Sequence, residues 1–103
     1  MPSNPVSYEV TVRVQDQATA NEFSAWMRRE HIPAVLATGL FSGAELAQLD
    51  DVSFRTAYLA ASRQNLERYL AEHTARLRDD FARRFGGKAT ATREVWDRLQ
   101  AWP

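Results

Sequence analysis

Residues 6–14 read VSYEVTVRV, which is the most regular pattern in the chain. Apolar side chains occupy every second position, and serine, glutamate, threonine and arginine fill the positions between them. This period of two predicts a β-strand with one apolar face and one polar face.

A helix is predicted directly after this strand. Thr19 and Glu22 have the spacing of a capping box, and an apolar stripe follows them at helical intervals. Because the residue before a proline avoids the α region, Pro33 predicts a break or kink near residues 31–32. A short further turn should follow, and Gly39 should end it.

The middle of the chain predicts a β-hairpin. Residues 52–61 (VSFRTAYLAA) have the composition of a strand, and Asp50-Asp51 before them are turn residues. Residues 40–49 contain several helix-favouring residues. We nevertheless expect them to form a strand, because the strand after the turn needs a partner.

A second helix has the clearest helical pattern. Ser62 is a suitable N-cap, and Gly86-Gly87 should end the helix. Its apolar stripe consists of Leu66, Tyr69, Leu70, His73, Leu77, Phe81 and Phe85. A last strand is predicted over residues 88–96, where Ala89, Ala91, Arg93 and Val95 alternate with the other side chains.

The expected order is therefore β-α-β-β-α-β, the order of an α+β, ferredoxin-like sandwich with two helices on one face of a four-stranded antiparallel sheet. With 103 residues, the chain should be one domain over residues 1–103, with a core at about 6–96.

Composition excludes several classes of function. Thirteen basic residues balance thirteen acidic ones, and no basic stripe alternates with aromatic residues, so we expect no nucleic-acid partner. The chain has no cysteine, and neither histidine has a carboxylate at metal-ligand spacing, so we expect no metal and no cofactor. Residues 1–5 do not resemble a signal peptide and no apolar run could cross a membrane, which predicts a cytoplasmic protein.

The sheet face away from the helices should have a mixed character. We expect the helix-covered face to carry Val10, Val12, Ala57, Leu59, Ala89, Ala91 and Val95. The open face should then carry Glu9, Thr11, Arg13, Phe54, Thr56, Tyr58, Thr90, Thr92, Glu94 and Trp96. Such a face suits a homodimer interface around a cavity, and the alternative is a half-solvated sheet.

His31 is the first candidate catalytic residue. Its place at the predicted helix break would let a neutral imidazole exchange protons near neutral pH. The alternative is a helix-end cap that binds free carbonyl groups. Its Gln variant separates the two, because a cap should lose stability and a catalytic residue should lose ligand binding or turnover. His73, on the apolar stripe, is more simply a packed core residue.

The remaining candidates come from the aromatic and charged residues. Tyr58 could be a phenol donor beside a ligand, or only a strand-favouring aromatic residue. Trp26 could wall a pocket or simply anchor the core. Ligand-binding candidates on the open face are Glu9, Arg13, Glu94 and Trp96. The three charged ones could form an ion pair across strands that lines a cavity or is solvated.

Several stretches resemble a bacterial family known only as domain of unknown function number 4286. The stretches are YEVTV at 8–12, WMRREHIPAVLATGLF at 26–41, LERYLAEH at 66–73 and RLRDDFARRFGG at 76–87. The resemblance implies a stand-alone domain of the dimeric α-β barrel group of ferredoxin-like proteins. That group includes cofactor-independent monooxygenases, small isomerases and dehydratases, as well as members without known activity.

Two hypotheses of function follow. In the first, a homodimer encloses a small aromatic or polar organic ligand between sheet and helices, with monooxygenase or isomerase-like activity that uses His31 and Tyr58. In the second, the protein is a non-catalytic structural or regulatory binding module, and its open sheet face serves only for association.

Overall fold

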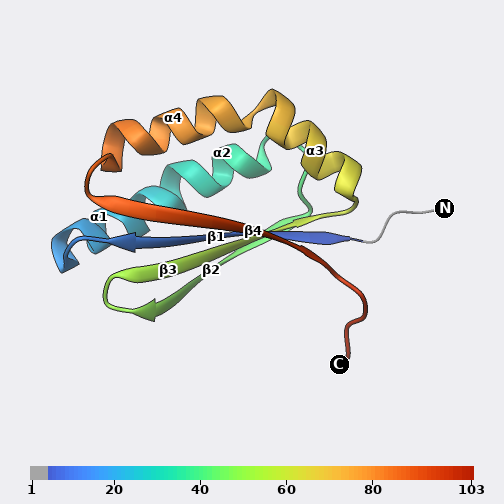
Figure 1. Ribbon diagram of the computed structural model, residues 1–103, viewed down its shortest axis with the longest axis horizontal. Coiled ribbons are helices and arrows are strands. Elements are labelled where there is room, and N and C mark those ends of the chain that lie inside the picture. The colour runs from blue at the N-terminus through green and yellow to red at the C-terminus, as the bar shows by residue number, and fades with distance from the viewer. Residues whose placement is uncertain (1–4) are drawn as a thin grey trace.

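In the computed structural model, which describes residues 5–103, strands and helices follow one another in the predicted order (Figure 1). The elements are β1 (Val6–Val14), α1 (Gln17–Trp26), η1 (Met27–His31), α2 (Ile32–Leu36), β2 (Gly43–Asp50), β3 (Ser53–Ala60), α3 (Arg63–Glu72), α4 (Thr74–Phe85) and β4 (Ala89–Asp97). The expectation that no signal peptide precedes the domain falls mostly on residues 1–4, which lie outside the described part.

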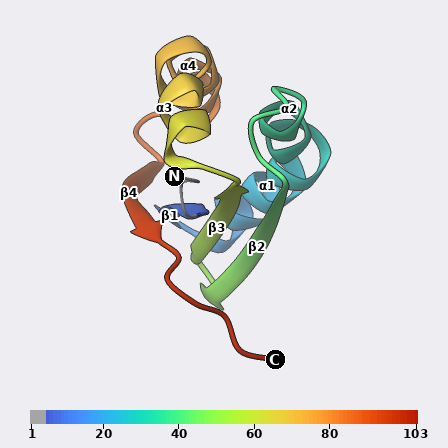
Figure 2. The ribbon, with the colours of Figure 1, turned by 90° about the vertical axis from the view of Figure 1, so that its right-hand side faces the viewer.

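The four strands form one antiparallel sheet in the order β2-β3-β1-β4. All the helices lie on one face of this sheet, α1 and α2 over one half and α3 and α4 over the other (Figure 2). The ferredoxin-like α+β fold predicted from the sequence is confirmed. The opposite face of the sheet has no cover within residues 5–103 (Figure 1).

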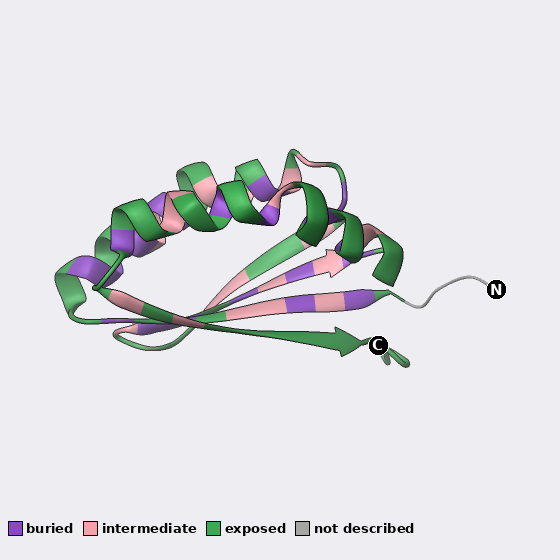
Figure 3. Cartoon of the chain, turned by 45° about the horizontal axis from the view of Figure 1, so that its top comes forward, coloured by how far each residue is buried: buried purple, intermediate pink, exposed green. Residues whose placement is uncertain are grey.

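The core lies between sheet and helices and has two neighbouring parts. One part gathers Val6, Tyr8, Val35, Leu40, Phe41, Tyr58, Ala60, Leu66, Tyr69 and Leu77. The other gathers Val12, Val14, Ala20, Phe23, Trp26, Met27, Phe54 and Phe85. Burial is greatest on β1 and β3 and falls off along β4, whose second half is exposed (Figure 3).

The strand β3 has the opposite phase to the one we predicted. Its aromatic residues Phe54 and Tyr58 are buried under the helices, at 5% and 2% exposure, whereas Ala57 and Leu59 are on the open face. The register explains this, because Tyr8 and Val12 of β1 stand opposite Tyr58 and Phe54. Side chains directly opposite each other in a sheet share a face. The larger rings bury more apolar area there than the aliphatic residues of the other phase would.

The helix does not break before Pro33, but it is irregular next to the position where the sequence predicts a break or kink. The backbone at Ile32 stays in the right-handed α region, with φ −60° and ψ −46°. The chain instead widens into the π-helical turn η1, where the Ile32 N–H bonds to the Met27 carbonyl. A wider turn can accommodate a proline, which has no N–H to donate. The N-cap of α1 is Asp16, whose carboxylate accepts from the Thr19 N–H at 2.8 Å, rather than Thr19 itself.

The single long helix predicted after Ser62 is divided at His73. Ser62 caps α3 as expected, its hydroxyl accepting from the Asn65 N–H at 3.1 Å. At His73 the backbone leaves helical geometry, with φ −125° and ψ −27°. The Thr74 hydroxyl donates to the Tyr69 carbonyl at 3.4 Å across this bend. The bend changes the direction of the helix, so that α4 runs above the sheet (Figure 1).

The predicted hairpin is present, with a later start. Strand β2 begins at Gly43, and Leu40 and Phe41 before it are buried in the core instead of being paired in the sheet. Gly39, with φ +77°, ends the helical segment as predicted.

Candidate functional site

A cavity lies between the helix-covered face of the sheet and the helices η1 and α4. The volume that the centres of water molecules can occupy is about 40 Å³. The whole empty volume, including the mouth to solvent, is about 480 Å³. The inner part is therefore wide enough for a few water molecules. Its walls include one imidazole, that of His31, and three phenol hydroxyls, those of Tyr8, Tyr58 and Tyr69.

His31 reaches this cavity from the last position of η1. Its ring stacks on the indole of Trp26, with centroids 4.6 Å apart and planes at 26°. It forms no hydrogen bond or ion pair with any residue of the described chain, so its nitrogens remain available to a ligand. Burial lowers the pKa of His31 from 6.5 to about 4, against a smaller upward effect of Asp80 and together with a downward effect of Arg93. The imidazole is therefore neutral at neutral pH.

The helix-end cap proposed as the alternative role of His31 does not fit its position. The helical backbone continues through His31 into α2, and its side chain makes no capping hydrogen bond. The π-helical turn directs the ring toward α4 and the cavity instead of toward free carbonyl groups.

Tyr58 enters the cavity from the centre of the sheet. Its hydroxyl is buried and has no hydrogen-bond partner within residues 5–103. A buried polar group without a partner costs stability, so this one calls for an explanation. Burial raises the pKa of Tyr58 far above its usual range, with smaller contributions from Tyr69 and Tyr8. The phenol is thus a neutral donor without a protein acceptor.

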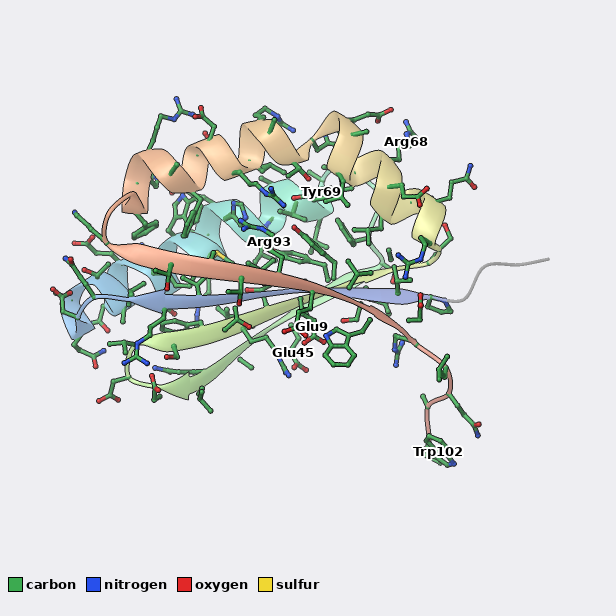
Figure 4. The ribbon with its side chains drawn as sticks, viewed as in Figure 1. Glu9, Glu45, Arg68, Tyr69, Arg93 and Trp102 are labelled. Carbon is green, nitrogen blue, oxygen red and sulfur yellow. The ribbon has the colours of Figure 1, made fainter. Side chains whose placement is uncertain are left out.

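Tyr69 and Arg93 complete the wall near the mouth of the cavity. They come from α3 and β4, and both lie between the sheet and the helices (Figure 4). Burial raises the pKa of Tyr69 to about 12, while Arg93 and Arg78 act in the opposite direction. Arg78 projects from α4 and its guanidinium is 3.5 Å from the Tyr8 hydroxyl.

The candidates named from the sequence fall on two sides of the sheet. His31 and Tyr58 line the same cavity, and Trp26 supports the His31 ring from behind. The other candidates, Glu9, Arg13, Glu94 and Trp96, alternate with the helix-facing residues of β1 and β4 and so lie on the open face. Glu9 points away from the helices in Figure 4. These four residues are therefore not part of the cavity that contains His31.

Sequence reasoning missed Tyr69, Arg78 and Arg93 as cavity residues. Arg93 did leave a signal, because it occupies the apolar phase of the last strand, between Ala91 and Val95. A charged residue at a position that should face the core points to a cavity or a partner there.

A second, more open hollow lies outside the cavity, between η1 and α4. His31 and Leu77 line both spaces and so separate them. An ion pair between Glu30 of η1 and Arg84 of α4, at 3.2 Å, joins these two elements. The Arg84 guanidinium also lies over the Trp26 ring, 5.9 Å from its centroid. These contacts hold the Trp26–His31 stack against α4.

The open face of the sheet is polar at its centre and apolar at one end. Glu9 and Glu94 are direct cross-strand neighbours, an unfavourable like-charge arrangement. Within residues 5–103 no recorded ion pair joins Arg13 to either of them, and Arg13 stands opposite Thr90 in the register of β1 and β4. Trp96, 53% exposed, lies toward the end of β4 on this face.

Metal-ligand clusters and membrane-spanning helices are both absent from the described residues. No group of three or more histidine, cysteine, aspartate or glutamate side chains in residues 5–103 could hold a metal ion. No helix in the same range is long and apolar enough to cross a membrane.

The fold is that of a ferredoxin-like α+β domain, with a cavity between its sheet and its helices. A family model, described as Domain of unknown function (DUF4286), matches residues 6–99, and the chain belongs to this family. The resemblance found in the sequence is thereby confirmed. No curated protein matches the chain.

Solved structures with the same fold include enzymes and uncharacterised proteins. SnoaB, a cofactor-independent oxygenase from Streptomyces nogalater, is similar with a TM-score of 0.74 and 17% identity, covering 98% of this chain and 99% of its own. HapK from Hahella chejuensis has a TM-score of 0.72 and 10% identity, with 95% and 96% covered. A protein of unknown function from Nitrosomonas europaea has a TM-score of 0.71 and 12% identity, with 100% and 97% covered. At such identities the likeness shows the fold alone.

Proposed function

We propose that the protein binds a small hydroxylated aromatic molecule in the cavity between sheet and helices and promotes its oxidation by dioxygen without a cofactor. The observation behind this proposal is that a neutral imidazole and a buried hydroxyl without a partner in residues 5–103 line one cavity, although they come from distant parts of the chain. The neutral His31 ring and the unpartnered Tyr58 hydroxyl line one cavity that is otherwise mostly apolar and aromatic. Ligand sites have this composition, an apolar wall with a few placed polar groups.

The two groups have complementary roles in this proposal. His31 accepts the proton of the ligand hydroxyl, and the Tyr58 O–H donates to the oxygen anion that remains. Arg93, at the mouth, further stabilises that anion. The resulting electron-rich ring can react with dioxygen directly, so no group other than these side chains is needed to activate it.

The overall reaction balances without any additional reductant. For a naphthol, the C–H bond opposite the hydroxyl breaks and a C=O bond forms there with one oxygen atom of dioxygen. The other oxygen atom leaves as water, and the ring becomes a quinone. Hydroxyarene plus dioxygen thus gives quinone plus water. The name of SnoaB, a cofactor-independent oxygenase of the same fold, supports this choice among possible reactions.

Binding of an aromatic ring requires the mouth of the cavity to widen. The inner space of about 40 Å³ is too small for a whole ring, but Phe81 is half-buried and Arg93 is exposed. The Arg93 side chain can turn outward, whereas Phe81 packs against the rings of Phe23, Trp26 and Phe85 and would have to shift against them. The ring of the ligand would then pack beside Phe81 and Tyr69.

The test measures binding and oxygen uptake with two probes, 1-naphthol and 1-hydroxy-2-naphthoate. The wild-type protein should bind at least one probe and accelerate its consumption of dioxygen. His31→Gln should lose the acceleration. His73→Gln is the matched control, because His73 lies outside the cavity, and it should behave as the wild type. Failure of both probes to bind would refute the proposed site, and binding without oxygen uptake would favour the non-catalytic binding module.

We further propose that the open sheet face forms a homodimer interface. Trp96 and the half-buried Ala57 and Leu59 provide an apolar area on this face. A copy related by two-fold symmetry could also place a cation beside Glu9 and Glu94, whose charges are not balanced within one chain. Sedimentation at micromolar concentration should give twice the mass of the 11.7 kDa chain, and Trp96→Glu should give a monomer. A wild-type monomer at high concentration would contradict the proposal.

A further inference from the structure

The cavity contains positive charge without any acidic side chain. Arg78 and Arg93 both line it, and no aspartate or glutamate is among its lining residues in the described chain. Arg93 has no ion pair within residues 5–103, and Arg78 has only the long contact with the Tyr8 hydroxyl. The two guanidinium groups therefore line one space whose own walls, within residues 5–103, supply no negative charge; Asp80 lies in the adjoining hollow.

Two cations around a partly enclosed aromatic space repel each other more than they would in open water. Both side chains are exposed, so solvent reduces this repulsion, but neither has an acidic partner within residues 5–103, whereas Arg55 pairs with Glu45 and Arg68 with Glu72. The effect of Arg93 also reaches the interior: with Arg78 it lowers the pKa of Tyr69, and it lowers the pKa of His31, although Asp80 acts more strongly there in the opposite direction. The cavity is thus electrostatically suited to an anion.

We propose that the ligand of this cavity is an aromatic carboxylic acid bound as its anion, with the carboxylate held by Arg93 and Arg78. This inference rests on the proposed function and specifies its substrate class. A planar guanidinium forms paired hydrogen bonds with the two oxygens of a carboxylate. The apolar walls would contact the ring, and the ligand hydroxyl would lie deeper, toward His31 and Tyr58.

A bound carboxylate would also change the behaviour of His31. Its negative charge offsets the field of Arg93, which favours the protonated imidazole. A ligand that brings its own anion would therefore make His31 a better proton acceptor than it is in the empty cavity. A neutral phenol brings no such charge.

The test compares two ligands of nearly the same shape, 1-hydroxy-2-naphthoate and 1-hydroxy-2-naphthamide, by calorimetric titration at neutral pH and low salt. The carboxylate should bind about tenfold more tightly or better, because a charge-assisted pair is stronger than a neutral hydrogen bond. Arg93→Gln and Arg78→Gln should each reduce this preference, and added salt should weaken it in the wild type. Arg68→Gln is the control, because Arg68 points to solvent on the outer side of α3 (Figure 4).

The outcomes separate this inference from the proposed function. Equal affinities for the two ligands would overturn the inference and leave the hydroxyaromatic site standing. Absence of binding for both would overturn the two together. A preference that persists in the Arg93→Gln/Arg78→Gln double variant would place the carboxylate elsewhere and would also overturn the inference. Arg93→Lys, which keeps the charge, checks that any loss comes from the missing cation, because it should retain part of the preference.

Discussion

Replacing His31 by glutamine should make the free energy of unfolding less dependent on pH. The pKa of the folded-state imidazole is lowered from 6.5 to about 4, mainly by burial. Between these values the unfolded chain binds a proton that the folded protein does not. The contribution of His31 to stability is therefore fully present above pH 6.5 and is lost as pH falls toward pH 4.

The magnitude follows from the two pKa values. Going from about pH 7.5 to about pH 5 should cost the wild type up to about 2 kcal/mol through this residue alone. Partial solvent exposure of the ring could reduce the figure to about 1 kcal/mol. Carboxylates titrate in both proteins, so the difference between wild type and variant isolates the histidine.

Urea denaturation at the two pH values, followed by tryptophan fluorescence and circular dichroism, measures the effect. Wild type should lose more stability than His31→Gln on acidification, by the amount above. Parallel pH profiles would refute the conclusion that His31 is held uncharged in a partly buried site. A larger loss in the variant would reverse the sign and refute it more strongly.

Three further substitutions test other parts of the structure. Tyr58→Phe removes a buried hydroxyl that has no hydrogen-bond partner within residues 5–103. Thermal unfolding should therefore show unchanged or slightly higher stability, by up to about 1 kcal/mol, while ligand binding weakens. A loss above about 1 kcal/mol would mean that the hydroxyl is satisfied. Phe23→Ala removes a ring that is 1% exposed and contacts Phe54 and Phe85. Urea denaturation should show that the free energy of unfolding falls by about 3–5 kcal/mol. A decrease under about 1 kcal/mol would contradict the place of Phe23 in the core. Gly39→Ala places a side chain at a residue with φ +77°. In urea denaturation it should lower the free energy of unfolding by about 1 kcal/mol. An unchanged urea midpoint would contradict the left-handed turn at Gly39.

The fold was predictable because the strongest patterns in the sequence are local. The alternation over residues 6–14 and the stripe that begins at Leu66 depend on period alone. Capping by Ser62 and the stop at Gly39 follow from single residues. These features fixed the element order, and the order left few topologies to consider.

The phase of β3 was not predictable in the same way. Residues 53–60 have aromatic side chains in one phase and aliphatic ones in the other, so either face could be buried. The choice depends on pairing with Tyr8 and Val12 of a strand distant in sequence. This error placed Tyr58 on the open face with Trp96, although it lies in the cavity with His31.

The two helix irregularities also depend on tertiary structure. A proline usually ends a helix, and the sequence does not reveal that a π-helical turn can accommodate Pro33. The bend at His73 lies within an apolar stripe that continues past it in the sequence, so the pattern gives no sign of the bend. That Arg78 and Arg93 line one cavity depends on the packing of α4 on the sheet, and so could not be inferred from their spacing in the sequence.

The most direct test of the site is a crystal structure of the protein soaked with 1-hydroxy-2-naphthoate. We expect the ligand between the sheet and α4, with its carboxylate at Arg93 and Arg78 and its hydroxyl toward His31 and Tyr58. Ligand found only on the open sheet face, or a cavity that stays closed at saturating ligand concentration, would contradict the account.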